Sequence, residues 1–285
     1  MLEFLSAHQH IQQQLLQTLR MSVILVLLTM FFVPLEHFFA VRKSPFHRAA
    51  WQANLGWYYL NGFLVTVLLA FPAFYIAKLI HFAIPSSITG AAAELPLWAR
   101  MVAAMVVGEV GYYWGHRLSH EVPFLWRFHA VHHSAEAVNF LVNGRGHPVD
   151  MIFTRLCGTT LLLATGLESS VGKDPGVVVA GVLLIVSIWS YFIHSNVRIR
   201  LGFLEEVIST PAFHHWHHTR EDHKDRNYSS MVPVMDRIFG TFYLPKAWPE
   251  VYGTDTPMPA DLIGQILEPF APRPKPLPMS IGQPG

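Results

Sequence analysis

The sequence has 285 residues, of which 52% are hydrophobic and only 14% charged, against roughly 25% charged in a typical soluble domain. This composition excludes a disordered chain, a coiled coil and an ordinary soluble globule. The formal net charge of +1 gives no reason to expect a nucleic-acid partner. The single Cys157 excludes an internal disulfide and any site built from several cysteines. Seventeen histidines, nearly as many as all lysines and arginines together, require an explanation.

Five apolar segments follow one another along the chain, at residues 21–41, 55–80, 97–115, 149–167 and 176–197. A bilayer core about 30 Å thick needs about 20 apolar residues per helix. We predict that four segments span a membrane and that 149–167, which contains Arg155, is a fifth span or an interfacial or re-entrant helix. The expected fold is all-α, a polytopic membrane helical bundle of four to five spans with a histidine-rich helical cap.

The charges of the loops predict which side of the membrane each loop occupies. The loop at 42–54 holds three basic residues and no acid, the loop at 116–148 holds three arginines, and Arg198 and Arg200 follow the last segment. Basic loops mark the cytoplasmic side. Residues 116–148 and the chain after 197 are therefore expected on that side, which makes the cap cytoplasmic.

Three clusters of histidines lie on that same side at helical spacing. One is an HxxxH at 116–120, the second an HxxHH at 129–133, and the third an HxxHH within 214–218. Residues three and four apart share a helix face, so each cluster projects its imidazoles in one direction. Burying them without a partner would be costly, and imidazole binds Zn, Cu, Fe and Ni. A centre for two metal ions is predicted from His116, His120, His129, His132, His133, His214, His217 and His218.

Single residues next to the clusters extend this candidate site. His194 ends the last apolar segment and is expected as a further ligand, because ionisable groups in membrane segments are usually functional. Glu109 shares a helix face with His116, where its carboxylate would accept an imidazole N–H or pair with an arginine. The roles of His147 and His215 stay open: each could be a metal ligand, a hydrogen-bond partner of a ligand or a packing residue. Further polar candidates for a role around the centre are Glu121, Asn139 and Asn227.

These motifs, in this order, resemble the fatty acid hydroxylase and sterol desaturase superfamily. The block EVGYYWGHRLSHE at 109–121 is similar to that family's pattern of an acidic residue, two tyrosines, tryptophan and HRxxH. FHAVHHSAE at 128–136, RGHP at 145–148, and NY at 227–228 followed by MDRIFGTFY at 235–243 continue the match. The resemblance covers residues 109–244, close to half of the chain.

The resemblance implies an integral membrane non-haem di-iron enzyme with its histidines at the cytoplasmic surface. Some members of the family carry a histidine four residues before the position of His194, where this chain has Ser190. The tenth ligand would then be missing, or it would be supplied by a water molecule, by His147 or by His215. Carried over by position, the implied iron ligands are His116, His120, His129, His132, His133, His194, His214, His217 and His218.

The implied reaction is attack on a C–H bond of a membrane lipid by an oxidant made from dioxygen at two iron ions. Hydroxylation is favoured over desaturation. The sequence contains no flavin, nicotinamide or haem motif, so the electrons would come from a separate cytochrome or ferredoxin or from a diffusible reductant. The alternatives are a sterol or hopanoid oxidase or desaturase, a metal transporter and a non-catalytic scaffold. Transporters usually place their ligands at mid-membrane on broken helices, whereas these clusters follow the spans.

Composition divides the chain into three parts. Residues 1–100 are expected to form N-terminal membrane helices, residues 101–245 the catalytic domain, and residues 246–285 a proline-rich tail that is mobile from about Glu268. The compact chain, without a fused electron-carrier domain, favours a bacterial inner membrane over an endoplasmic reticulum.

Overall fold

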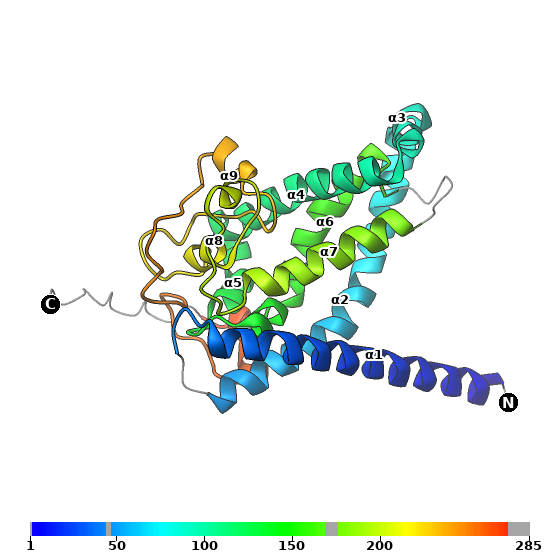
Figure 1. The fold of residues 1–285 in the computed structure, drawn as a ribbon. Helices are drawn as coiled ribbons and strands as arrows, with labels where there is room; N and C mark the ends of the chain where they lie inside the picture. Colours follow the sequence, from blue (N-terminus) through cyan, green and yellow to red (C-terminus); the bar gives the residue numbers. More distant parts are fainter. Residues whose placement is uncertain (1, 44–46, 169–175, 273–285) are drawn as a thin grey trace, which may run out of the picture.

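The computed structural model describes residues 2–43, 47–168 and 176–272, and this part of the chain is helical (Figure 1). It contains no β-strand, only two isolated bridges, between Ala40 and Val197 and between Thr219 and Tyr252. The all-α prediction is therefore confirmed. The helices are α1 (Leu2–Phe38), α2 (Arg48–Ala83), α3 (Ser86–Ala91), η1 (Ala92–Glu94), α4 (Leu97–Glu121), α5 (Pro123–His133), η2 (Phe140–Gly144), α6 (Pro148–Thr165), α7 (Val177–Ile193), η3 (Gly202–Glu206), α8 (Pro211–His217), α9 (Val234–Ile238), α10 (Leu262–Leu267) and η4 (Glu268–Phe270).

Two of the described helices, α1 from Ile11 onward and α2, are long and apolar enough to cross a membrane. Both leave most of their apolar side chains outside the protein core; Met30 and Phe71, for example, are 70% and 69% exposed. Apolar surface of this extent is stable in lipid rather than in water. The chain is thus a membrane protein with two candidate spans. The other three apolar segments lie in α4, α6 and α7, and the predicted number of four to five spans stays a prediction.

The helix α4 is the centre of the bundle, since α5, α6 and α7 all pack against it. Its contact with α6 is close because glycines on both helices leave room for the facing backbone. A Cβ on Gly111 would lie 2.4 Å from the Cys157 carbonyl oxygen, and one on Gly158 would lie 3.2 Å from the Gly108 carbonyl oxygen. Small residues allow such approach between membrane helices. The contact aligns the C-terminal end of α4 with the N-terminal end of α6.

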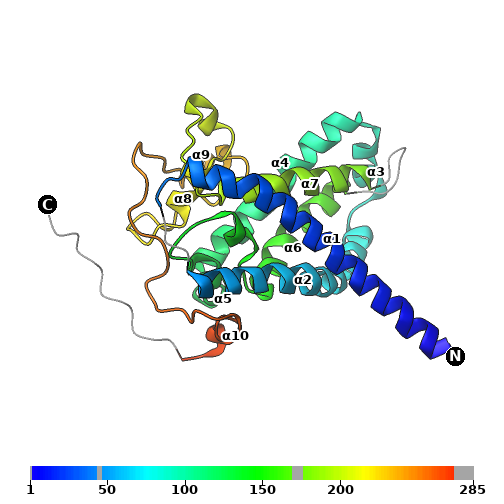
Figure 2. The ribbon, with the colours of Figure 1, turned by 60° about the horizontal axis from the view of Figure 1, so that its bottom comes forward.

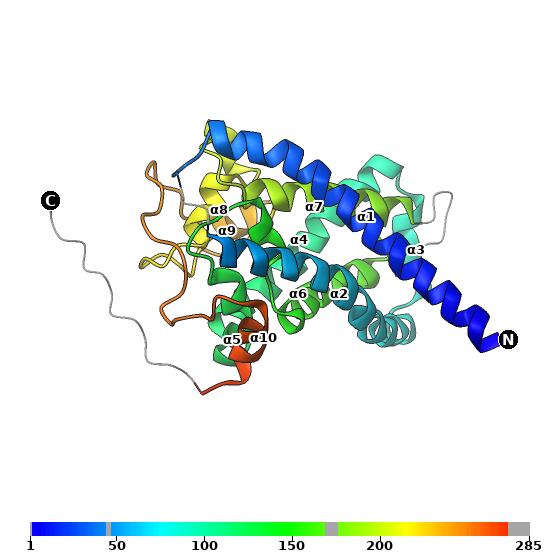
Figure 3. The ribbon, with the colours of Figure 1, turned by 90° about the horizontal axis from the view of Figure 1, so that it is seen from below.

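The histidine-bearing segments all lie at one end of the bundle, and α3 lies at the other (Figure 1). The helix α1 runs across the bundle to that histidine end, while its N-terminal end projects beyond the other helices (Figures 2 and 3). There Phe32 stacks on Phe140, and the Glu36 carboxylate accepts hydrogen bonds from the backbone N–H groups of Phe140 and Asn196. The first helix is therefore tied to η2 and to the chain just after α7.

The described part of the predicted C-terminal tail packs against the rest of the molecule. Gln265 of α10 accepts a hydrogen bond from the Trp57 indole at 2.7 Å, and Phe270 of η4 contacts the rings of Phe128 and His147. Figures 2 and 3 show α10 beside α5 and α2. A mobile tail from about Glu268 was expected; residues 268–270 form η4, and residues 273–285 of that expected tail lie outside the described residues.

Candidate metal centre

Local sequence signals place the three histidine clusters on separate helices that meet at the end of the bundle. The helix α4 ends at Glu121, and Pro123 starts α5 at once, so the chain turns a corner between the first two clusters. The third cluster lies on α8, which begins with Pro211 in its first turn and with the Thr210 hydroxyl accepting a hydrogen bond from the Phe213 N–H. His194 follows the last residue of α7.

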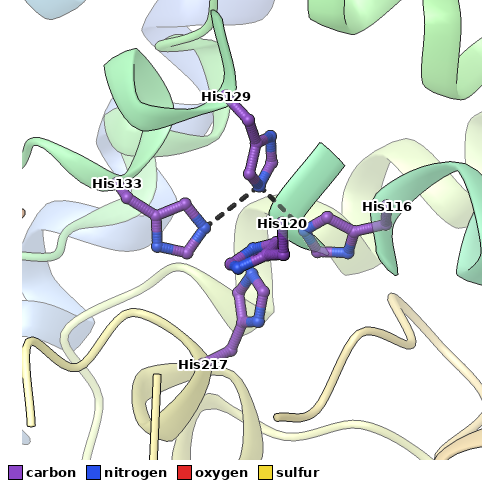
Figure 4. Close-up of side chains that lie close together, drawn as sticks. All are labelled: His116, His120, His129, His133 and His217. Atoms are coloured by element: carbon purple, nitrogen blue, oxygen red, sulfur yellow. Dashed lines mark hydrogen bonds between the residues drawn. The ribbon is translucent and has the colours of Figure 1, made fainter. Parts of the chain in front are cut away.

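These helices bring nine histidines together as two groups of potential ligands. Within each group the ligand nitrogens all lie within 4.8 Å of one another. We call them the five-histidine group and the four-histidine group; Figure 4 shows the first. The five-histidine group consists of His116, His120, His129, His133 and His217. The four-histidine group consists of His132, His194, His214 and His218.

The two groups are neighbours because α5 and α8 each supply histidines to both. His132 and His133 are adjacent in sequence but belong to different groups, as are His217 and His218. Successive side chains on a helix point about 100° apart, so one helix faces two centres at once. The rings of His133 and His218 stack with their centroids 4.5 Å apart, which places the groups in direct contact.

Burial holds several of these histidines in the neutral form that a metal ligand requires. Burial lowers the pKa of His116 to about 3 and that of His132 to about 4. Burial and the neighbouring imidazoles likewise hold the pKa of His120, His133 and His217 well below the ordinary value. At neutral pH these imidazoles therefore each carry one ring proton and one lone pair.

The hydrogen bonds to the Nδ1 atoms show where those protons lie. In the five-histidine group, His116 donates from Nδ1 to the Tyr228 carbonyl oxygen at 2.7 Å, and His129 donates from Nδ1 to the Asp150 carboxylate at 2.9 Å. The Nε2 atom of His116 is then unprotonated, and it lies 3.1 Å from His129 Nε2 (Figure 4). His133 Nε2 lies 3.1 Å from the same His129 atom.

The four-histidine group repeats this arrangement. His132 donates from Nδ1 to the Arg145 carbonyl oxygen and His194 to the Ser190 carbonyl oxygen, both at 2.7 Å, while their Nε2 atoms face each other at 3.2 Å. Two lone pairs at this distance repel unless a cation lies between them. Nitrogens bound to one ion at about 2.1 Å are separated by about 3 Å. The residues of both groups therefore fit a bound metal ion.

Two carboxylates that the sequence analysis did not single out contact the five-histidine group. Asp150, in the first turn of α6, is buried; its second oxygen accepts a hydrogen bond from the Ser119 hydroxyl at 2.8 Å. Asp225 lies in the loop after α8, 3.2 Å from His120 Nδ1, with 57% of its side chain exposed. Neither is at a helical spacing from the histidine that it contacts, so no local pattern identifies them.

His147 and His215 are placed outside both groups and bond elsewhere. His147 caps the N-terminus of α6 through the Val149 N–H and packs between Trp57 and Phe128. His215 contacts the Tyr252 hydroxyl at 2.8 Å and donates from Nε2 to the Ser195 carbonyl oxygen at 3.0 Å. Of the roles left open for these two histidines, the geometry favours packing and bracing.

Among the described residues, the carboxylate of Glu109 hydrogen-bonds to no imidazole and to no arginine. It accepts hydrogen bonds from the Ser230 hydroxyl and the Met231 and Val232 N–H groups, and so fixes the loop before α9 to α4. The expectation that Glu109 orients a ligand directly is corrected by these contacts. This buried carboxylate, about two turns before His116 on α4, finds its donors in the loop before α9.

The remaining polar candidates also have bracing contacts in the described structure. Glu121 pairs with Arg117 on the surface, and the Asn139 side chain accepts from the Leu141 N–H at the start of η2. Asn227, with φ of +59°, donates to the carbonyl oxygens of Phe213 and Tyr243 and so holds the chain beside α8.

The position of the family's tenth histidine is part of a polar contact between α7 and η2. The Ser190 hydroxyl donates to the Asn143 side-chain oxygen at 2.5 Å, and the Ser190 carbonyl accepts from His194. Ser190 thus helps to orient a candidate ligand of the four-histidine group.

Comparison with known proteins places this geometry in a family. Residues 101–241 match the fatty acid hydroxylase family. An ornithine lipid hydroxylase of Rhizobium tropici is 33% identical over 183 residues, which cover 62% of this chain and 52% of that protein. Alkylglycerol monooxygenases of Danio rerio and Homo sapiens are 32% and 33% identical over 58% and 47% of this chain, and 35% and 28% of their own length. No solved structure matches the chain.

The matched region contains all nine histidines of the two groups, together with both carboxylates that contact them. The relatives named above are a hydroxylase and monooxygenases, although this chain spans about half of the first and about a third of the next. The chain belongs to the fatty acid hydroxylase superfamily, whose matching members here are oxidoreductases.

Proposed function

We propose that this protein is a membrane non-haem di-iron oxygenase that hydroxylates a C–H bond of a lipid with dioxygen and external electrons. The observation that carries the proposal is the pair of buried histidine groups in which the Nε2 atoms of facing imidazoles lie about 3 Å apart. Imidazole alone does not select iron. The choice of iron and dioxygen rests on the hydroxylase and monooxygenase relatives.

Two iron ions bound to the two groups would supply the electrons that reduce dioxygen and the oxidant that attacks the C–H bond. The protein's own part is to orient the imidazoles and to exclude water. Backbone carbonyls fix the rings of His116, His132, His194 and His217 through their Nδ1 atoms. All nine histidines except His132 are buried, which keeps bulk water from the reacting centre.

The arrangement of α4, α6 and α7 supports entry of the substrate from the lipid. The helices α6 and α7 both pack on α4 but have little contact with each other. Between them Arg155 of α6 is exposed and lies within electrostatic range of Tyr112 on α4 and Tyr191 on α7. The Tyr112 ring in turn contacts the candidate ligand His116, with centroids 5.3 Å apart. This polar strip therefore leads from the side of the bundle to the metal centre.

Arg155 favours a lipid that has an anionic headgroup as the substrate. No acidic side chain pairs with it among the described residues. A guanidinium in a membrane helix is costly to leave without a partner, and its geometry matches a carboxylate or a phosphate. We assign the headgroup to Arg155 and the carbon that is oxidised to the part of the lipid next to His116.

The electron donor is proposed to be a separate cytochrome, a ferredoxin or a diffusible reductant. The proposed location is a bacterial inner membrane with the metal centre on the cytoplasmic side. The bacterial hydroxylase among the relatives supports a bacterial membrane. The basic residues Arg42, Lys43 and Arg198 at the histidine end of the bundle support a cytoplasmic metal centre.

The first experiment counts metal and product in the purified full chain. After anaerobic reconstitution with ferrous iron in detergent, we expect about two irons per chain, one for each group. A double variant His132→Ala, His217→Ala, which removes one ligand from each group, should lose them, and His81→Ala, on an exposed part of α2, should retain them. Absence of stoichiometric metal from the wild type would refute the metal centre.

The loaded protein is then supplied with dioxygen, a diffusible reductant and lipids with anionic or zwitterionic headgroups. We expect one hydroxylated product per oxygen consumed, with the anionic lipids preferred. Arg155→Gln should raise KM for the anionic lipid about tenfold, equivalent to about 1.4 kcal/mol of lost binding, without loss of iron. Arg198→Gln, which removes an exposed charge outside this strip, is the matched control. Full iron occupancy without any lipid oxidation would contradict the oxygenase proposal.

A further inference from the structure

The two histidine groups differ in the hydrogen-bond acceptors that contact the Nδ1 atoms of their imidazoles. In the five-histidine group, two imidazoles contact carboxylates through Nδ1: His129 contacts Asp150 at 2.9 Å and His120 contacts Asp225 at 3.2 Å. In the four-histidine group no carboxylate takes this position among the described residues. Its Nδ1 atoms on His132 and His194 face backbone carbonyls.

The other two histidines of the four-histidine group are less well supported. The Nδ1 atoms of His214 and His218 are buried and have no hydrogen-bond partner. A ring without a partner at Nδ1 is neither oriented nor made more basic by its surroundings. The four-histidine group, which has fewer ligand nitrogens, therefore also has fewer hydrogen bonds that orient its imidazoles.

The difference matters because a carboxylate behind an imidazole strengthens its bond to a metal. The negative charge polarises the ring N–H and raises the basicity of the other nitrogen, and the hydrogen bond fixes the ring's orientation. Loss of such a partner typically reduces metal affinity by about 10- to 100-fold. A carbonyl oxygen, being neutral, has a smaller effect than a charged acceptor.

Asp150 and Asp225 contact different imidazoles of the five-histidine group. Asp150 is buried, and its two oxygens are shared between His129 and the Ser119 hydroxyl, so its position is fixed. Asp225 is more than half exposed and reaches His120 from the loop after α8. A divalent cation bound to the five nitrogens would thus have two negative charges one imidazole away.

We infer that the two groups are unequal metal sites, and that the five-histidine group backed by Asp150 and Asp225 binds its ion first and more tightly. The four-histidine group then fills second and is the one from which metal is lost first. This inference rests on the proposed metal centre but not on the proposed lipid oxidation, since it concerns binding of the ion alone.

The test is an anaerobic titration of the purified full chain with ferrous iron against a competing chelator. The wild type should bind in two separate phases of one ion each. His214→Ala, which removes a ligand of the four-histidine group, should abolish the weaker phase and leave the tighter one. His217→Ala should weaken the tighter phase and leave one ion bound at the affinity of the weaker phase.

Asp225→Asn tests the carboxylate itself. It should weaken the tighter phase about 10- to 100-fold and leave the weaker phase unchanged. The control is Asp222→Asn, an identical loss of charge three residues away at an exposed side chain. Asp150→Asn should act on the same phase as Asp225→Asn, with retention of helical circular dichroism as the check that this buried variant folds.

Three results would overturn the inference. One is binding of both ions in a single phase by the wild type; another is an Asp225→Asn titration that matches that of Asp222→Asn. The third is a loss of the tighter phase in His214→Ala, which would assign the higher affinity to the other group. Absence of binding in the wild type would refute the metal centre as well, whereas normal two-phase binding without lipid oxidation would leave this inference intact.

Discussion

At the scale of single residues, adjacent histidines in one cluster have different structural roles. On α8, His214 belongs to a ligand group, whereas the next residue, His215, connects the Tyr252 hydroxyl to the carbonyl oxygen of Ser195. Ser195 directly follows the candidate ligand His194. The contact of His215 thus holds the end of α7 against α8 and sets the distance between two ligands that it does not join.

This assignment predicts opposite outcomes for two adjacent substitutions. His215→Phe keeps a ring of similar size but removes the hydrogen bonds of the imidazole to the Tyr252 hydroxyl and the Ser195 carbonyl, at a cost of about 1–3 kcal/mol in the free energy of unfolding. At saturating iron it should still bind as much metal as the wild type. His214→Phe should lose one ion. Thermal unfolding and metal analysis of both variants check this, and loss of an ion from His215→Phe would make His215 a ligand.

Which histidines lie together was largely predictable from spacing, but their division into two groups was not. Histidines three and four residues apart share a helix face, and this rule identified His116 with His120 and His129 with His133. Which of two adjacent histidines faces which centre depends on how α5 lies between α4 and α8. Asp225 comes from a loop, and its contact with His120 depends on tertiary structure that no local pattern encodes.

At the scale of helices, the contact between α4 and α6 sets the geometry of the five-histidine group. His116 and His120 extend from the last turns of α4, while Asp150 reaches His129 from the first turn of α6. The glycines of the α4–α6 contact let the two backbones approach. A wider separation would move the Asp150 carboxylate away from the imidazole that it orients.

Gly111→Ala should therefore destabilise the protein even though alanine is the better helix former. The helical preference for alanine is worth about 1 kcal/mol. The new Cβ would lie 2.4 Å from a backbone oxygen of Cys157, and overpacking of this kind typically costs about 1–3 kcal/mol. We expect a lower melting temperature of the metal-free protein in detergent and weaker iron binding.

Gly90→Ala is the matched control, because a Cβ there meets nothing within 4 Å on the exposed helix α3. Its iron content should equal that of the wild type. Its melting temperature should equal that of the wild type or be slightly higher. Equal behaviour of the two variants would show that the close α4–α6 contact is not needed for the centre.

At the scale of the whole molecule, the helices separate a basic end from an end with little charge. The helix α2 has 36 residues, about 54 Å at 1.5 Å per residue, and joins the two ends. The histidine-bearing helices lie at one end and α3 lies at the other (Figure 1). Arg42 and Arg198 belong to the histidine end, since the Arg42 N–H bonds to Asn196, two residues after His194, and the Arg198 N–H bonds to Phe39. Residues 84–96, around α3, carry only one charge, that of Glu94. By the positive-inside rule this distribution supports the proposed cytoplasmic location of the histidine end.

The proposed orientation predicts the labelling of two single cysteines, each in a Cys157→Ala background. A membrane-impermeant maleimide added to spheroplasts should label Gly90→Cys, which is exposed on α3 and outside the cytoplasm in this arrangement. Asp222→Cys, on the loop beside the metal centre, should be labelled only after the membrane is opened. Because both sites are exposed on the protein, a difference in labelling reports the membrane and not burial. The reverse pattern would put the centre outside the cytoplasm, where a cytoplasmic ferredoxin could not reduce it, and would require an electron donor on the other side.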